Sequence, residues 1–190
     1  MNVYDFDNTI YNGESTLDFF MFCVKKHPLL IRFLPKAIGV AIRYKRCRLS
    51  KEELYCEIEK YDREFLKIAG DIRQLSREFW DKNIYKIKNF YSKIQKEDDV
   101  IVSASFGFLL NEAMKRLNIK NCICSEIDIN SGKIIRLCFD ENKVQYFKES
   151  FPDEKIHNFY SDSMNDRPLM LLAENSYIVR GEKIVPVVIN

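Results

Sequence analysis

Two short apolar runs lie near opposite ends of the 190-residue chain, and each leads directly into a pair of acids. The first, residues 1–4, precedes Asp5 and Asp7, and the second, residues 156–160, precedes Asp162 and Asp166. Runs of this length and composition are typical of buried strands. In an open parallel sheet the carboxyl ends of the strands lie along one edge, where ligands collect. The pattern therefore predicts that the four acids share one edge of a sheet.

Four carboxylates at one edge would repel one another unless a cation neutralised them. Their ligand atoms would all be oxygens, and neither His nor Cys is close to them in the sequence. This donor set favours Mg²⁺ over zinc. The sequence thus predicts a hard-cation site.

The rest of the chain divides into a helical stretch and an alternating stretch. Residues 14–94 show helical spacing without a strand signal, and they predict a small bundle with helices over residues 17–26, 29–48, 50–69 (opened by a capping box at Ser50) and 71–94. The remainder predicts strands at residues 100–102, 122–129, 134–137, 156–160, 177–179 and 184–189, and helices at 106–117, 141–151 and 163–173. Alternation of this kind indicates an α/β domain with a parallel sheet. We expect residues 1–13 and 95–190 to form that domain, with the helical block 14–94 inserted after the first strand.

Four short motifs follow one another in the order Asp5-x-Asp7-x-Thr9, Ser103 after an apolar strand, Lys143 at the start of a helix, and Asp162-x-x-x-Asp166. Together they resemble the four motifs of the haloacid dehalogenase (HAD) superfamily. The helical insertion after the first motif is similar to that of its phosphoserine-phosphatase-like branch. Residues 160–169 and the basic apolar segment 28–48 further resemble bacterial phosphatidylglycerophosphatases of that branch. The resemblance implies a Rossmann-like core, an all-helical cap and Mg²⁺-dependent phosphatase activity.

The resemblance also implies a role for each matched residue. Asp5 would be the nucleophile that forms an aspartyl-phosphate, and Asp7 would act first as general acid and then as general base. Ser103 would donate a hydrogen bond to a phosphoryl oxygen, and Lys143 would supply a positive charge for the developing anion.

The Mg²⁺ ion would be bound by the Asp5 carboxylate, the Asp7 backbone carbonyl and Asp162, with Asp166 tightening the site. Asn8 stands where the family commonly has Gly, and asparagine tolerates positive φ. Ser161 replaces the Gly usual before the acid of the fourth motif, which stiffens the loop and adds a hydroxyl. Neither departure removes a reacting group.

Basic residues gather in one part of the chain. Nine of them and no acid lie between residues 19 and 51, although the net charge of the whole chain is only +2. Arg32, Lys36, Gly39 and Arg43 form a narrow stripe on a broadly apolar helix. This helix either packs within the bundle or contacts an anionic membrane surface. A membrane span is not expected, because Arg32 and Lys36 interrupt the run well short of about 18 apolar residues.

Other functional classes remain open. In a non-catalytic binding module the basic helices would hold nucleic acid or a protein, but the intact set of reacting residues argues against this, and no nucleic-acid partner is expected. A phosphotransferase is a rival, and a dehalogenase is a weaker one because it would need no metal-binding acids. The expected partner is a small phosphorylated substrate whose leaving group could be a lipid, serine, a sugar or a nucleotide.

The expected location is the cytoplasm, at the inner membrane face if the stripe contacts lipid. The six cysteines show neither disulfide nor zinc spacing, which favours buried thiols in a reducing compartment. The first strand also begins too early for a signal peptide to precede Asp5.

Overall fold

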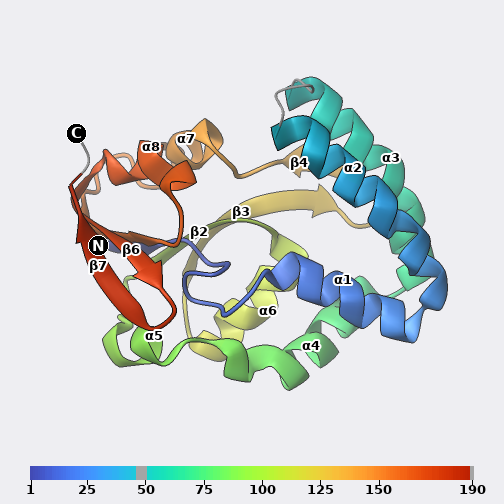
Figure 1. Ribbon diagram of the computed structural model, residues 1–190, viewed down its shortest axis with the longest axis horizontal. Helices are drawn as coiled ribbons and strands as arrows, with labels where there is room; N and C mark the ends of the chain where they lie inside the picture. The colour runs from blue at the N-terminus through green and yellow to red at the C-terminus, as the bar shows by residue number, and fades with distance from the viewer. Residues whose placement is uncertain (46–50, 189–190) are drawn as a thin grey trace.

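The structure is a computed structural model that describes residues 1–45 and 51–188 (Figure 1). At its centre lies a seven-stranded sheet in the order β4-β3-β2-β1-β5-β6-β7. Its strands are β1 (Asn2–Tyr4), β2 (Val100–Phe106), β3 (Asn121–Asp128), β4 (Lys133–Arg136), β5 (Ile156–Ser161), β6 (Ala173–Arg180) and β7 (Lys183–Val187). The five inner strands run parallel, whereas β4 and β7 pair antiparallel at the two edges. The predicted α/β class with a mostly parallel sheet is confirmed.

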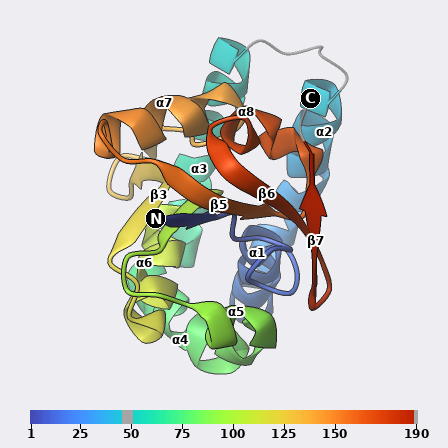
Figure 2. The same ribbon diagram turned by 90° about the vertical axis from the view of Figure 1, so that its left-hand side faces the viewer.

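Helices cover both faces of the sheet (Figures 1 and 2). On one face lie α7 (Glu141–Ser150) and α8 (Arg167–Met170), and on the other lie α4 (Ile72–Asn83), α5 (Asn89–Ile94) and α6 (Gly107–Leu117). The helical segments that follow the loop after β1 are α1 (Ser15–Lys26), the 3-10 helix η1 (Pro28–Phe33), α2 (Leu34–Lys45) and α3 (Lys51–Ala69), and we call these four segments the cap. The cap helices stand at the side of the molecule where β3 ends and β4 begins.

Alternation along the central strands builds a separate hydrophobic cluster on each face, because successive side chains of a strand point to opposite faces. Val3 of β1 and Val100 of β2 belong to the cluster under α7 and α8. Their neighbours Tyr4 and Ile101 belong to the larger cluster under α4, α5 and α6. All four side chains are fully buried. The short apolar runs in the sequence are therefore buried strands, as their composition predicts.

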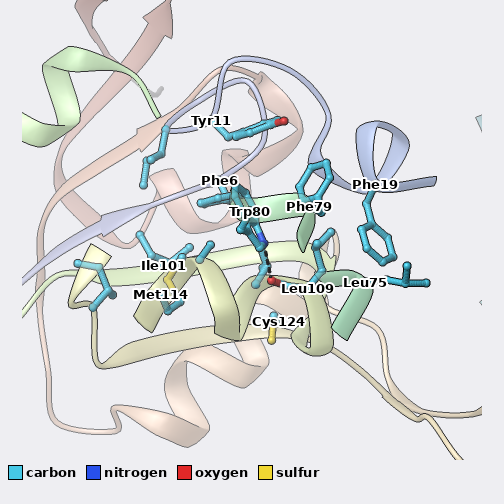
Figure 3. Close-up of a cluster of buried hydrophobic side chains, with 14 of the residues drawn as sticks. Phe6, Tyr11, Phe19, Leu75, Phe79, Trp80, Ile101, Leu109, Met114 and Cys124 are labelled. Atoms are coloured by element: carbon cyan, nitrogen blue, oxygen red, sulfur yellow. Dashed lines mark hydrogen bonds between the residues drawn. The ribbon is translucent and has the colours of Figure 1, made fainter. Parts of the chain in front are cut away.

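The larger cluster joins the inserted segment to the rest of the protein (Figure 3). Trp80 of α4 is buried against Phe6 and Phe79, and its indole Nε1 donates a hydrogen bond to the Leu109 carbonyl of α6 at 2.8 Å. Tyr91 of α5 likewise packs edge-on against a β1 tyrosine. Because α4 and α5 share a core with the sheet, packing marks no break at residue 94. The division into residues 14–94 and the remainder stays a prediction.

The single helix expected over residues 71–94 is wrong. The structure breaks it into α4, the 3-10 helix η2 (Ile84–Lys86) and α5. At the break the backbone pairs with the loop that follows β1: the Asn12 amide donates to the Lys86 carbonyl and the Lys88 amide donates to the Ile10 carbonyl. An isolated bridge joins Tyr11 to Ile87. These hydrogen bonds to a distant loop replace the hydrogen bonds of a continuous helix. The spacing of apolar residues does not reveal such a replacement.

Three further expectations need adjustment. The helix expected over 29–48 begins as η1, and its α-helical part starts at Leu34, so Pro35 lies in a first turn, where proline breaks no hydrogen bond. The helix expected over 163–173 is instead the 3-10 helix η3 (Met164–Asp166) followed by α8, and β6 already begins at Ala173. The capping box at Ser50, the basic residues Arg46 and Arg48, and the end of the last expected strand at residue 189 lie outside the described residues.

The cap contacts the β3–β4 hairpin closely. The Arg63 Nε donates a hydrogen bond to the Ser131 carbonyl at 3.0 Å, and the Ile134 amide donates to Glu59 at 2.9 Å. Gly132 has a φ of 72°, and a Cβ atom there would lie 2.8 Å from the Arg63 Cα. Only glycine fits this turn without moving α3. The predicted hairpin is thus confirmed, and it also supports the cap.

The basic stripe faces acids and rings of the cap itself. Arg32 forms an ion pair with Glu64, and Arg43 forms one with Glu57 at 3.0 Å. The Lys36 ammonium lies over an aromatic ring of α3, 4.9 Å from its centroid. These contacts favour the bundle interpretation of this segment over docking on lipid. In the part of the chain that the structure describes, no helix combines the length and apolar composition needed to cross a bilayer.

Candidate active site

Asp5 and Asp7 lie in the loop at the carboxyl end of β1, the central strand of the sheet. The Asp5 amide still donates to the Tyr160 carbonyl of β5 at 2.9 Å, so the backbone leaves the sheet only after this residue. Asn8 then takes a φ of 58°, and its amide donates to the Gly13 carbonyl. The positive φ expected at Asn8 is confirmed, and it turns the chain so that the segment between β1 and α1 stays compact.

Lys143 joins two of the predicted acids. Its Nζ lies 2.8 Å from Asp5 Oδ1 and 2.7 Å from Asp166 Oδ1, and the three side chains are 6%, 11% and 7% exposed. Lys143 comes from the first turn of α7, whereas Asp166 ends η3. Burial alone would lower the pKa of the Lys143 ammonium, but the attraction of the two carboxylates prevails and raises it. The lysine is therefore a permanent positive charge beside Asp5.

Asp5 keeps a raised pKa even with this partner. Burial raises the pKa of its carboxyl, the charge of Lys143 lowers it, and the negative charge of Asp166 raises it again. One ammonium thus faces two carboxylates in a largely buried site. This excess of negative charge would favour the binding of a cation near Asp5.

Thr9 ties Asp5 to the loop that carries Asp162. Its hydroxyl donates to Asp5 Oδ2 at 3.1 Å and accepts from the Asp162 amide at 2.8 Å. Ser161, one residue earlier, donates to Asp166 Oδ2 at 2.8 Å. Asp162 itself is half-buried, and burial together with the charge of Asp166 raises its pKa. The structure therefore brings the two distant motifs together. The hydroxyl of Ser161, which stands where the family usually has Gly, helps to hold Asp166 in place.

The Asp7 carboxylate is held by the start of the cap. Its Oδ1 accepts from the Ser15 amide at the first residue of α1, and its Oδ2 accepts from the Ser105 hydroxyl, both at 2.6 Å. Burial raises the pKa of Asp7, and the hydrogen bonds from these two serines oppose the rise. A carboxyl with a raised pKa is suited to giving up a proton to a leaving group and taking one back.

Ser103 lies within β2 and is almost completely buried. Its hydroxyl accepts from the Ser105 amide at 3.1 Å, and Ser105 in turn bonds to Asp7. Sequence reasoning did not single out Ser105. The sequence could have indicated it, because residues two apart in a strand face the same side of the sheet. Ser105 would therefore be expected on the same face as Ser103.

Lys88 is a second buried lysine that sequence reasoning missed. It is 6% exposed, and its Nζ donates a hydrogen bond to the Asn8 carbonyl in the loop after β1. Burial lowers its pKa, although the charges of Asp162 and Glu182 oppose the shift. No local pattern marks this lysine, because it reaches the site only through the break between α4 and α5.

The described residues contain no group of three or more His, Cys, Asp or Glu side chains that could hold a metal ion. The ligands implied by the resemblance are different in kind: two carboxylates, Asp5 and Asp162, and the backbone carbonyl of Asp7. Mg²⁺ commonly takes only one or two carboxylates and completes its shell with water and substrate phosphate. The excess negative charge around Asp5 and the oxygen-only donors therefore fit Mg²⁺.

Comparisons with known proteins place this site in a family. The family model of haloacid dehalogenase-like hydrolases matches residues 3–171, which span all four motifs. The comparison with curated proteins gives no match. Several solved structures share the fold and match 90% or more of this chain.

A protein with unknown function from Bordetella pertussis Tohama I is 17% identical, with a TM-score of 0.71, and the match covers 93% of this chain and 87% of that one. A phosphoserine phosphohydrolase-like protein from Francisella tularensis subsp. tularensis SCHU S4 is 19% identical, with a TM-score of 0.57 and coverage of 93% and 86%. A HAD family hydrolase from Salmonella enterica subsp. enterica serovar Typhi is 11% identical, with a TM-score of 0.60 and coverage of 90% and 59%. At these identities the likeness concerns the fold. This chain therefore belongs to the haloacid dehalogenase-like hydrolases and has the fold of their phosphoserine-phosphatase-like branch.

Proposed function

We propose that this protein is a Mg²⁺-dependent phosphatase that hydrolyses a phosphomonoester through an aspartyl-phosphate on Asp5. The observation that carries the proposal is the buried ammonium of Lys143, which lies within 2.8 Å of both Asp5 and Asp166. A lysine so placed can stabilise negative charge at the atom that attacks phosphorus. Catalysis of phosphoryl transfer consists mostly of such positioning and charge stabilisation.

In the first step an Asp5 carboxylate oxygen forms a bond to phosphorus while the bond from phosphorus to the ester oxygen breaks. Asp7 gives its proton to the departing oxygen, which leaves as an alcohol. In the second step Asp7 takes a proton from water, and the water oxygen attacks phosphorus and releases Asp5 and phosphate. Ser103 and Lys143 hold the phosphoryl oxygens in both steps.

The hydrogen bonds that Asp7 accepts from α1 and β2 favour separate roles for the two aspartates, with Asp5 as nucleophile and Asp7 as general acid and base. Both of its carboxylate oxygens are held by Ser15 and Ser105, so the side chain has a fixed direction. Thr9 fixes the Asp5 carboxylate in the same way. When bound by Asp5, Asp162 and the Asp7 carbonyl, Mg²⁺ would neutralise the charge that gathers on the phosphoryl group.

The leaving group belongs to a small phosphorylated substrate. The alternative of a lipid phosphatase at a membrane surface has less support, because the described stripe residues Arg32 and Arg43 are engaged by acids of α3. The alternative of a non-catalytic binding module leaves the buried contacts of Asp5, Asp7 and Lys143 without a purpose. We place the enzyme in the reducing cytoplasm, which agrees with the free thiols of all cysteines in the described residues.

The test is phosphate release from an aryl phosphate such as p-nitrophenyl phosphate, measured with Mg²⁺, with EDTA, and with EDTA followed by excess Mg²⁺. We expect turnover that is lost with EDTA and restored by Mg²⁺. Asp5→Asn should show no turnover under any of these conditions, because an amide is no nucleophile. Activity that is indifferent to the chelator, or that survives in Asp5→Asn, would refute the proposal.

A further inference from the structure

The cap borders a cavity of about 380 Å³ that lies between α1, η1, α2, α3, the start of α6 and the adjoining ends of β2 and β3. We call it the cap cavity. Its volume lies within the range of small-molecule sites, which is about 300–1,000 Å³. Its wall is mostly aromatic and contains six phenylalanines: Phe19, Phe20, Phe33, Phe65, Phe106 and Phe108. The rings pack on one another, as for Phe20 and Phe65 at 5.9 Å, so the wall is a built surface.

A chain of hydrogen bonds links the wall of the cap cavity to the predicted general acid, Asp7. Thr16 of α1 lines the cavity, and its hydroxyl lies 2.8 Å from the Ser105 hydroxyl. Ser105 donates to Asp7 Oδ2 at 2.6 Å, and the next residue, Phe106, lines the cavity as well. Two hydrogen bonds therefore connect the cavity wall to the carboxyl that would protonate a leaving oxygen. A leaving group on this side of Asp7 has the cap cavity as the adjacent space.

One carboxyl interrupts the aromatic wall. Asp62 of α3 lines the cap cavity, and its Oδ2 is buried without a hydrogen-bond partner among the described residues. The other lining acid, Glu57, is paired with Arg43 at 3.0 Å. Burial raises the pKa of Asp62 to about 7, and the charge of Glu59 adds to the rise. Asp62 thus places a carboxyl without a hydrogen-bond partner among the described residues in the wall of the cavity, and because buried polar groups in native proteins nearly always have a partner, it indicates a ligand that donates a hydrogen bond.

We infer that the cap cavity binds the alcohol part of the phosphomonoester, and that this part is an apolar ring or chain carrying one hydrogen-bond donor that bonds to Asp62. This inference rests on the proposed phosphatase function and names its substrate class. The donor is a hydroxyl or an amine, since both satisfy a carboxyl oxygen. A compact, fully polar leaving group would leave the apolar surface of the cap cavity uncovered.

The first experiment measures kcat/KM for a series of alkyl phosphates from two to ten carbons. Burying one methylene in an apolar site is worth a factor of up to about four in affinity. We expect kcat/KM to rise by about that factor per carbon until the cavity is full, and then to level off. Equal kcat/KM along the series would overturn the inference.

A pair of variants locates the effect. Ala37 lines the cavity from α2, and Ala37→Trp should fill its mouth and abolish the rise along the series. Its neighbour Ile38 is 50% exposed and is not part of the lining, so Ile38→Trp is the matched control and should leave the series unchanged. The same effect in both variants, or in neither, would contradict the placement.

A second comparison tests Asp62 and uses ω-hydroxyalkyl and ω-aminoalkyl phosphates of the optimal chain length. We expect one of them to exceed the plain alkyl phosphate in kcat/KM by about tenfold, as for a hydrogen bond to a buried group. Asp62→Leu should remove this preference while it retains the chain-length series. A preference for the hydroxyalkyl phosphate would identify the donor as a hydroxyl, and a preference for the aminoalkyl phosphate would identify it as an amine. If the wild type prefers the plain alkyl ester, Asp62 does not bind the ligand and that part of the inference is wrong.

Binding of butan-1-ol, hexan-1-ol and octan-1-ol by calorimetry separates this inference from the proposed function, since alkanols need no turnover. Affinity that rises with chain length in the wild type and is lost in Ala37→Trp supports the cap cavity even if no phosphate ester is hydrolysed. Hydrolysis of aryl phosphate without any alkanol binding would support the phosphatase and overturn the assignment of the cavity. The rise of affinity with chain length is read in the wild type, so that part of the result does not depend on how a variant folds.

Discussion

Replacing Lys143 with methionine tests the charge network at the centre of the site. Methionine retains the length of the side chain but removes the charge that faces Asp5 and Asp166. The three side chains are at most 11% exposed, so the two carboxylates would be left buried without their cation. Breaking a buried ion pair in this way costs about 3–5 kcal/mol of stability. We expect Lys143→Met to be inactive. At pH 7.5 its free energy of unfolding should be lower than that of the wild type by this amount.

The loss should depend on pH with a defined sign. Lys143 favours the ionised form of both buried carboxyls, so its removal lets the folded protein hold protons at a pH where the unfolded chain, with an Asp pKa of about 3.9, has lost them. The folded variant then binds protons more tightly than the unfolded chain, so its stability rises as pH falls. The difference from the wild type should therefore shrink between pH 7.5 and pH 5. Adding Asp166→Asn to the variant should restore part of the stability at pH 7.5 and none of the activity.

Urea unfolding followed by circular dichroism measures these quantities, provided that the slope with denaturant is unchanged. Lys26→Met is the matched control, because Lys26 pairs with Glu78 on the surface, where the two side chains are 37% and 33% exposed. A pair exposed to this extent contributes little to stability. If Lys143→Met destabilises no more than Lys26→Met, or if its loss is independent of pH, the network does not act as described.

Three further variants test other parts of the argument. Asp7→Asn should lower kcat for alkyl phosphates far more than for aryl phosphates, because an aryl oxygen leaves without protonation; an unchanged ratio between the two substrates would rule out the general-acid role. Asp62→Asn should be more stable than the wild type by an amount that grows as pH rises from about 4 to about 7. The reason is that the raised pKa of Asp62 makes the wild type lose stability through that window, by up to about 1.4 kcal/mol per pH unit. If Asp62 had an ordinary pKa, the free energies of unfolding of the two proteins would run parallel across this pH range. Trp80→Phe should cost about 1–3 kcal/mol in urea unfolding, because the buried Leu109 carbonyl loses its donor, and a loss below 0.5 kcal/mol (roughly the error of such measurements) would indicate that another donor replaces the indole.

The sequence by itself determined the family and the order of the central elements. Residues 1–4, 100–102 and 156–160 are short apolar runs, and buried parallel strands must be apolar on both faces. The acids after the first and last of these runs follow strand ends, so the topology of a parallel sheet already places them along one edge. The turn at residues 130–133 was equally readable, because its Gly132 and flanking strands form a local pattern.

Only the tertiary structure decided how these residues contact one another. Ser105 bonds to Asp7, 98 residues away, and Lys88 reaches the loop after β1 because backbone bonds to that loop break the expected helix. The cap cavity and Asp62, which has no hydrogen-bond partner among the described residues, arise where five helical segments and two strand ends meet. Periodicity reports which face of an element is apolar but not which partner covers it. Such pairings depend on the packing of elements distant in sequence, and no local signal specifies that packing.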